Sequence, residues 1–301
     1  MRAAAARFLH PAEPHRATSA PTTRGRDAAL MQLWLLGSGS SGNALAVAHG
    51  EHILMVDAGF PLPVLTDRLR DAGLHSWLVS DVVLTHGHRD HVLGAADGAR
   101  VYGWRVWGTL GTVWRWRALR DAGVRPFEPG VHFDAGPFRV HTAPTLHDVD
   151  DSAAVVVEGP DGGRVGVATD LGRATPAVRR LLAGVDVLVV EANYEPKLLR
   201  EGRYPPELQE RVASSTGHLS NDQAARLARA VAHAGLTHVV LAHISAHNNT
   251  PELAVRRVTA ALAGTAFRGR VVAAPRHDVL GPIAVGGGAA VAAEGPAAAP
   301  A

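Results

Sequence analysis

Residues 83–91 of the chain read Val-Leu-Thr-His-Gly-His-Arg-Asp-His, and this stretch decides the fold. Val83 and Leu84 suit the end of a buried strand, after which the chain becomes polar at once. Three imidazoles and one carboxylate then occur between His86 and His91, a density typical of metal ligands. The alternative is a polar surface loop that is rich in histidine by chance. It is disfavoured because His and Asp recur at the ends of later strands.

The spacing of this loop allows it to serve two metal ions. An extended backbone places the side chains of His86 and His88 on the same side, because strand side chains alternate with a period of two. A helix that starts near Asp90 would put Asp90 and His91 in its first turn, facing the same cavity from the other side. Neutral imidazole and carboxylate suit zinc, and also manganese or iron, so the spacing alone leaves the metal open.

Composition restricts how such a site can be built. A chain of 301 residues can bury a full core, as one large domain or two small ones. The shares of 47% hydrophobic and 19% charged residues are ordinary for a soluble globular protein, whereas 17 histidines are many. Cysteine is absent, so disulfides are excluded and any metal site must consist of His, Asp, Glu and solvent.

Charge and hydropathy narrow the classes of partner. The formal net charge is +2, and its positive surplus lies in the arginine-rich first thirty residues, so the body is close to neutral. This argues against a surface that coats nucleic acid everywhere but leaves room for a local basic groove. No apolar run approaches the roughly 18 residues of a membrane span, and the N-terminal segment lacks the apolar centre of a secretory signal. We therefore expect no membrane partner and a cytoplasmic location.

The same pattern predicts the domain organisation. Residues 1–30 are rich in Ala, Arg, Pro and Thr, and we expect a disordered extension there. Residues 31–285 should form the folded domain, followed by a disordered Gly/Ala/Pro tail over residues 286–301. Because Met31 opens an apolar strand pattern directly, a translation start at Met31 stands as an alternative to Met1.

Polar residues recur at the ends of predicted strands. Apolar patterns predict strands over residues 32–36, 44–48, 53–56, 82–84, 131–133, 138–141, 153–157, 165–170, 185–190, 237–241 and a last one over 271–273. Helical patterns cover residues 62–72, a segment from Thr109 onward, an excursion within 195–211, residues 221–234 after a Ser220 or Asn221 cap, and 251–262. Strand ends or the loops just beyond them carry Asp57, His147, Asp170, Glu191 and His243. Such a pattern predicts a site at one edge of the sheets, where the loops collect.

Two stretches each have two interpretations. Residues 37–43, Gly-Ser-Gly-Ser-Ser-Gly-Asn, could hold a phosphate, although a tight turn between two strands is the favoured interpretation. Residues 102–120 interleave four tryptophans with four arginines, which can stack bases and neutralise phosphates. The favoured interpretation is a helix from Thr109 whose tryptophans pack on the sheet while its arginines stay solvated.

The order of these motifs resembles the metallo-β-lactamase fold superfamily. Asp57, the loop from His86 to His91, His147, Asp170 and His243 stand in the order of that superfamily's five motifs. Residues 38–43, 217–221 and 243–251 resemble its YycJ/WalJ-type branch, which is related to the ribonuclease Z group. The resemblance covers about residues 31–285. It implies an α/β fold of the αββα sandwich type, with two mixed β-sheets face to face and helices outside.

The resemblance also implies a role for each motif residue. His86, His88 and His147 would hold one metal ion, Asp90, His91 and His243 a second, and Asp170 would bridge them. Asp57 would orient the histidine loop, and the catalytic residues would be Asp90, His218 and Glu191, with His218 and Glu191 as an acid pair. Arg89 stands at a variable position of the loop and adds a cation near the site. Substrate contacts would come from Ser38, Ser40, Ser41, Asn43 and Asn249.

The chemistry of such a site leads to a hypothesis about function. Two divalent ions about 3.5–4 Å apart lower the pKa of a bridging water and stabilise both oxygens of an in-line displacement. The chemistry alone does not distinguish a nuclease from another hydrolase. The resemblance implies two divalent ions, zinc first and manganese as the alternative, and hydrolysis of a phosphodiester in a nucleic acid. DNA is favoured, with a role in repair. An alternative is a hydrolase of small esters, lactones or thioesters, which would need a closed apolar pocket. A non-catalytic regulatory metal protein and a homodimer also remain open.

Overall fold

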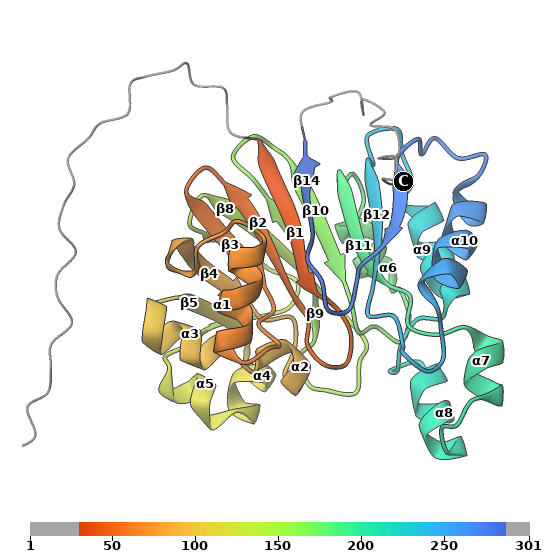
Figure 1. Ribbon diagram of the computed structural model, residues 1–301, viewed down its shortest axis with the longest axis horizontal. Coiled ribbons are helices and arrows are strands. Elements are labelled where there is room, and N and C mark those ends of the chain that lie inside the picture. The colour runs from red at the N-terminus through yellow and green to blue at the C-terminus, as the bar shows by residue number, and fades with distance from the viewer. Residues whose placement is uncertain (1–29, 287–301) are drawn as a thin grey trace, which may run out of the picture.

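Two mixed β-sheets lie face to face in the computed structural model, which describes residues 30–286, and helices cover their outer faces (Figure 1). The first sheet has the strand order β14-β1-β2-β3-β4-β5-β6. Its strands are β1 (Met31–Gly37), β2 (Ala44–His49), β3 (His52–Val56), β4 (Val79–Val83), β5 (Arg105–Thr109), β6 (Arg125–Phe127) and β14 (Leu280–Val285). The predicted αββα sandwich is therefore confirmed.

The second sheet repeats this plan with the order β13-β12-β11-β10-β9-β8-β7. Its strands are β7 (His132–Ala135), β8 (Phe138–Pro144), β9 (Ala153–Glu158), β10 (Arg164–Ala168), β11 (Val187–Glu191), β12 (His238–Ala242) and β13 (Arg270–Ala273). Strands β10 to β13 run parallel, as do β3 to β6 in the first sheet. The carboxyl ends of each parallel set therefore meet at a single edge of their sheet.

The helices differ in length and in the face that they cover. The first group is α1 (Leu62–Asp71), α2 (Arg89–Val92), α3 (Ala95–Tyr102), α4 (Leu110–Arg115) and α5 (Arg117–Asp121). The second group is α6 (Pro176–Leu181), α7 (Pro196–Glu201), α8 (Pro206–Ala213), α9 (Asn221–Ala230) and α10 (Pro251–Leu262), and a short 3₁₀ helix, η1 (Ser76–Leu78), precedes β4. None of these helices is long and apolar enough to cross a membrane.

Three apolar layers hold the sandwich together. The central layer lies between the sheets and includes Leu54, Val83, Val155 and Val189. A second layer joins the first sheet to α1, α3 and α5, and a third joins the second sheet to α6, α9 and α10. Because both faces of the central strands are buried, these strands are apolar almost throughout, which explains why the sequence pattern predicts them well.

Some elements differ from the sequence prediction. The sequence predicted a last strand over residues 271–273. One more strand, β14, follows it and pairs with β1 in the first sheet. The helix expected from Thr109 onward is broken at Trp116 into α4 and α5. Trp104 is buried as expected, but the side chain of Trp114 is 69% exposed and does not pack on the sheet. The expected disordered tails lie almost wholly outside the described residues.

Candidate metal centre

All seven predicted metal ligands lie at one edge of the sandwich, beside α2 in the lower part of Figure 1. The first sheet contributes His86 and His88 after β4, followed by Asp90 and His91 in α2. The second sheet contributes His147 after β8, Asp170 after β10 and His243 after β12. The two halves of the chain thus meet at this site.

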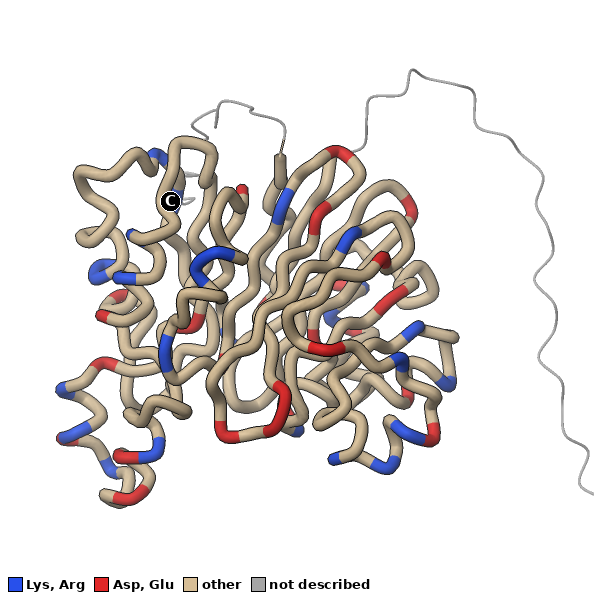
Figure 2. The backbone as a smooth tube through the Cα atoms, turned by 180° about the vertical axis from the view of Figure 1, so that it is seen from behind, with Lys and Arg blue, Asp and Glu red and all other residues tan. Residues whose placement is uncertain are grey.

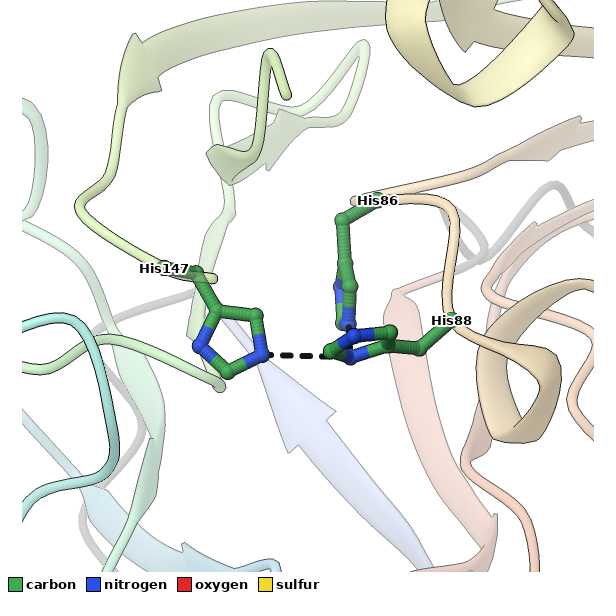
Figure 3. Close-up of side chains that lie close together, drawn as sticks. All are labelled: His86, His88 and His147. Atoms are coloured by element: carbon green, nitrogen blue, oxygen red, sulfur yellow. Dashed lines mark hydrogen bonds between the residues drawn. The ribbon is translucent and has the colours of Figure 1, made fainter. Parts of the chain in front are cut away.

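Three histidines form a group that fits one metal ion (Figure 3). The Nε2 atom of His86 lies 3.1 Å from Nδ1 of His88, and Nε2 of His147 lies 3.2 Å from the same atom. Tetrahedral ligands at about 2.1 Å from zinc are about 3.4 Å apart, so these three nitrogens are spaced like the ligands of a single ion.

A second group consists of Asp90, His91 and His243. Oδ2 of Asp90 lies 3.7 Å from Nε2 of His91 and 3.6 Å from Nε2 of His243. Asp170 lies between the two groups, with its carboxylate oxygens 3.1 Å from Nε2 of His91 and 3.9 Å from Nε2 of His147. Its position matches that of a carboxylate that bridges two cations.

The polar atoms of this cluster fit a bound cation. Oδ2 of Asp170 and Nε2 of His243 are buried and have no hydrogen-bond partner among the described residues. Although burial opposes ionisation, the neighbouring imidazoles of His243 and His91 hold the pKa of Asp170 well below its usual range. Burial and the neighbouring imidazole of His91 lower the pKa of His86, so its ring is neutral. Ionised carboxylate and neutral imidazole are the states that metal ligands need.

Asp57 holds the histidine loop in place through contacts with Thr85 and His91. Its carboxylate accepts hydrogen bonds from the backbone N–H of Thr85 at 2.8 Å and from the Thr85 hydroxyl, and contacts Nδ1 of His91 at 2.7 Å. Although burial opposes the charged ring, Asp57 and Asp170 raise the pKa of His91 well above its ordinary value. A carboxylate in contact with the Nδ1 atom of His91 is the arrangement expected of a residue that orients a ligand histidine.

Three site residues have left-handed backbone conformations. The φ angle is +62° at Asp57, +55° at Asp170 and +50° at His243, and each residue closely follows a strand. Non-glycine residues rarely adopt this region, and strained backbone of this kind clusters at functional sites. The turns after β3, β10 and β12 are therefore shaped to direct these side chains into the cluster.

The second ring nitrogen of most ligand histidines is also held. Nδ1 of His147 lies 3.2 Å from the carbonyl oxygens of Thr216 and Gly217, and Nδ1 of His86 lies 3.0 Å from the Thr85 hydroxyl. Such bonds fix the ring orientation and leave Nε2 free for a cation.

Asp148 supports the group of three histidines and was assigned no role from the sequence. Its Oδ1 lies 3.2 Å from Nε2 of His88 and 3.3 Å from Nε2 of His147. Its Oδ2 accepts a hydrogen bond from Nε of Arg211 in α8 at 2.9 Å and forms an ion pair with Nη2 of the same residue at 2.7 Å. Asp148 is adjacent to His147 in sequence, but no spacing rule links it to Arg211.

Glu191 is buried and pairs with the partly exposed His218 beside Asp170. Oε1 of Glu191 accepts hydrogen bonds from the N–H groups of Leu171 at 2.7 Å and Leu219 at 3.0 Å. Oε2 of Glu191 lies 3.0 Å from Nδ1 of His218, which is 3.4 Å from Oδ1 of Asp170. Burial disfavours the charged ring, but the hydrogen bond and charge of Glu191, together with the charges of Asp170 and Asp148, outweigh burial and raise the pKa of His218 to about 9. The ring of His218 therefore favours its protonated form at neutral pH.

A cavity of about 160 Å³ opens beside this pair. It is lined by polar and apolar side chains from α8 and the site loops, among them Ser40, Asp148, Tyr204, Arg211 and His218. A small polar ligand group could therefore reach His218 and the metal ligands from the side of α8.

The structure divides the predicted substrate contacts into two sets. Ser38 and Asn43 are buried: the Ser38 hydroxyl accepts the N–H of His243 at 2.7 Å, and Nδ2 of Asn43 lies 3.0 Å from Nε2 of His91. Asn249 is also buried, and its amide bonds to Asn221 and to the carbonyl of Ala192. Ser40 and Ser41 are exposed, and Ser40 lines the cavity. Of the five predicted contacts, Ser40 and Ser41 are therefore the two that a substrate could reach from solvent.

Comparison with known proteins gives a consistent result. The family described as Beta-lactamase superfamily domain matches residues 54–244. The chain is 30% identical over 240 residues to exodeoxyribonuclease YycJ of Bacillus anthracis, covering 77% of this chain and 89% of the relative. It is 27% identical over 239 residues to exodeoxyribonuclease WalJ of Streptococcus pneumoniae, covering 73% and 84%.

Solved structures share the fold. The metallo-β-lactamase fold protein YhfI of Bacillus subtilis aligns with a TM-score of 0.61 at 19% identity, over 83% of this chain and 99% of that one. The short form of human tRNase Z aligns with a TM-score of 0.58 at 16% identity, over 84% and 99%. At these identities the likeness concerns the fold alone.

Proposed function

Because the chain belongs to the metallo-β-lactamase superfamily, in the branch of the exodeoxyribonucleases YycJ and WalJ, we propose that it hydrolyses phosphodiester bonds of DNA with two bound divalent metal ions. The superfamily and these relatives make the chain a metal-dependent hydrolase. The observation that carries the proposal is the position of Asp170, which lies between two separate groups of ligands. A single-ion site would need only one of these groups.

Each of the two groups of predicted ligands would hold one ion. His86, His88 and His147 would hold one, Asp90, His91 and His243 the other, and Asp170 would contact both. Two divalent ions at such a site supply a strong nucleophile from water at neutral pH and stabilise negative charge on the phosphate. Nitrogen and carboxylate ligands favour zinc, with manganese as the alternative.

The residues around the ligands handle protons. His218 keeps a proton at neutral pH, and we assign to it the donation of that proton to the leaving oxygen. Glu191 holds Nδ1 of His218, so the Nε2–H is the group left to donate. The Asp90 carboxylate stays ionised, since the neighbouring imidazoles of His243 and His91 lower its pKa against the effect of burial. It is therefore ready to orient an attacking water.

The remaining assignments belong to the same proposal. The relatives are named exodeoxyribonucleases, which supports DNA over RNA as the substrate and removal of nucleotides from an end. A role in DNA repair, a cytoplasmic location and a homodimer are consistent with such an activity. Ser40 and Ser41, which are exposed beside the cavity, are our candidates for contacts to the phosphate backbone.

Metal analysis followed by a substrate panel tests this function. We expect the purified chain to contain zinc or manganese and to degrade end-labelled DNA and bis-p-nitrophenyl phosphate, with little action on a thioester. Substitution of both His86 and Asp170 by alanine should abolish these activities. The matched control is H141A, because His141 pairs with Glu158 on the surface of β8 and does not contact the ligands. Cleavage of the thioester alone would instead identify a hydrolase of small molecules.

A further inference from the structure

Helix α4 presents two large apolar side chains to solvent. Trp114 is 69% exposed and Leu110 is 47% exposed. The two residues are four positions apart, so they lie on the same face of the helix. The side chain of Trp116 packs inward by contrast, and its Nε1–H donates to the carbonyl of Gly87 at 2.7 Å. The exposure of Trp114 is therefore not explained by a role in the core.

This helix is built against the metal-ligand loop. Gly87 lies between the ligands His86 and His88, and a Cβ atom at Gly87 would come within 2.9 Å of Cδ of Arg115. The N–H of Gly111, in the first turn of α4, donates to Oδ2 of Asp151 at 3.1 Å. Asp151 belongs to the loop that carries the ligand His147. Helix α4 thus contacts the ligand loops of both sheets.

A cavity of about 240 Å³ lies between these elements. It is lined by Gly87, Gly111, Trp114 and Arg115 on one side and by Val149 and Asp150 on the other. Gly87 lies between two predicted ligands and Val149 lies two residues after a third, so the cavity is next to both ligand loops and has Trp114 in its wall.

The surroundings of Trp114 are basic on one side. The Arg120 guanidinium lies 5.7 Å from the centre of the Trp114 ring, and its Nη1 donates to the Trp114 carbonyl. Arg115 is exposed and has no carboxylate partner among the described residues, whereas Arg117 pairs with Asp121 at 3.4 Å. Figure 2 shows basic segments along these helices at lower right. The carboxylates near the cavity are Asp150 and Asp151, and Asp151 already accepts the N–H of Gly111.

We propose that Trp114 and Arg115 bind the single-stranded part of a DNA substrate next to the scissile phosphate. This inference rests on the proposed function. An exposed indole offers a face on which an unpaired base can stack, and the adjacent guanidinium can pair with the phosphate that follows. Bases inside a duplex have both faces covered by their neighbours, so such a platform favours a base that is unpaired and unstacked. The occupant is therefore an unpaired nucleotide.

Replacement of Trp114 tests the platform, with Trp77 as a matched control. Trp77 is 67% exposed but lies in η1, which precedes β4, whereas the ligands follow β4. We expect W114A to raise the dissociation constant for a labelled oligothymidylate roughly 5- to 100-fold, since stacking on an aromatic side chain contributes about that factor per base. W77A should bind like the wild type, W114F should recover most of the affinity, and hydrolysis of bis-p-nitrophenyl phosphate should be unchanged in all three.

Other results would overturn the platform. Wild-type affinity of W114A for the oligothymidylate would show that the base does not stack there. An equal loss for blunt duplex and single strand would mean a contact to paired DNA instead. A change from dimer to monomer in W114A by sedimentation, with unchanged DNA binding, would identify a contact between copies of the chain. If the wild type cleaves bis-p-nitrophenyl phosphate but neither binds nor cleaves DNA, the proposed DNA substrate itself fails.

Discussion

At the scale of single residues, the Glu191–His218 pair shows how burial and charge act against each other. Glu191 is fully buried, and a buried carboxylate is stable only when it is paired or hydrogen-bonded. Two backbone N–H groups and the ring of His218 meet this need. The same contacts hold the loops after β10 and before α9 together. The pair thus links two site loops, and it is the proton donor of our proposal.

The ionisation of His218 can be measured in the metal-free protein. Because the pKa of about 9 lies above the ordinary value of 6.5, the NMR signal of this ring should remain that of the protonated form through pH 8. The pair therefore stabilises the fold fully below about pH 6.5, and this contribution is lost as the pH rises through 9. E191Q should lower the pKa of His218, because the hydrogen bond and charge of Glu191 are lost while burial remains. A His218 pKa near 6.5 in both proteins would refute the assignment.

Asp57 is expected to act on metal affinity rather than on the chemical step. D57N should weaken metal binding by about 10- to 100-fold, the usual effect of losing a carboxylate behind a ligand histidine. Competition with a chromophoric chelator measures this change. D134N is a suitable control, because Asp134 forms an exposed pair with Arg139 on β7 and β8. Equal affinities of D57N and the wild type would rule out the orienting role.

At the scale of elements, α8 reaches the metal centre through one ion pair. Arg211 is largely exposed, and exposed pairs contribute at most about 1 kcal/mol to stability. Asp148, however, also contacts the rings of His88 and His147. The pair therefore connects the position of α8 with the orientation of two ligands.

Substitutions at this connection should separate stability from metal binding. We expect D148N to weaken metal affinity about 10-fold and R211A to have a smaller effect, with both melting temperatures within a few degrees of the wild type. Thermal unfolding and chelator competition give the two quantities. A large drop in melting temperature with unchanged metal affinity would assign the pair to folding alone.

Elements also show why the sequence predicts part of the structure and not the rest. The apolar strands that end in Asp57, Asp170 and His243 are visible because period and composition are local properties. The helix from Thr109 was predicted, but the exposure of Trp114 was not, since it depends on which face of the helix the rest of the fold covers. The contact of Asp148 with Arg211 joins residues that only the tertiary fold brings together. Strand β14 was missed because its pairing with β1 spans almost the whole domain.

At the scale of the whole molecule, the site joins the two sheets. The first sheet supplies His86, His88, Asp90 and His91, and the second supplies His147, Asp170 and His243. A cation bound here would contact both halves of the sandwich and neutralise their buried carboxylates. Metal binding should therefore stabilise the protein as a whole.

Chelation tests this coupling. Removal of the metal with EDTA should lower the melting temperature, and return of zinc should restore it, because a ligand at 1,000 times its dissociation constant stabilises the native state by about 4 kcal/mol. The variant H86A/D170A should show almost no shift, whereas H141A should shift like the wild type. A melting temperature independent of metal in the wild type would show that the ions do not connect the sheets.

The central claim is that two ions act together in the cleavage of DNA, and a metal titration tests it most directly. Release of nucleotides from end-labelled single-stranded DNA is measured while zinc or manganese is added to the metal-free protein. We predict that activity rises until two equivalents per chain are bound and is absent in D170N at every concentration. Full activity at one equivalent, or activity of D170N equal to the wild type, would contradict the account.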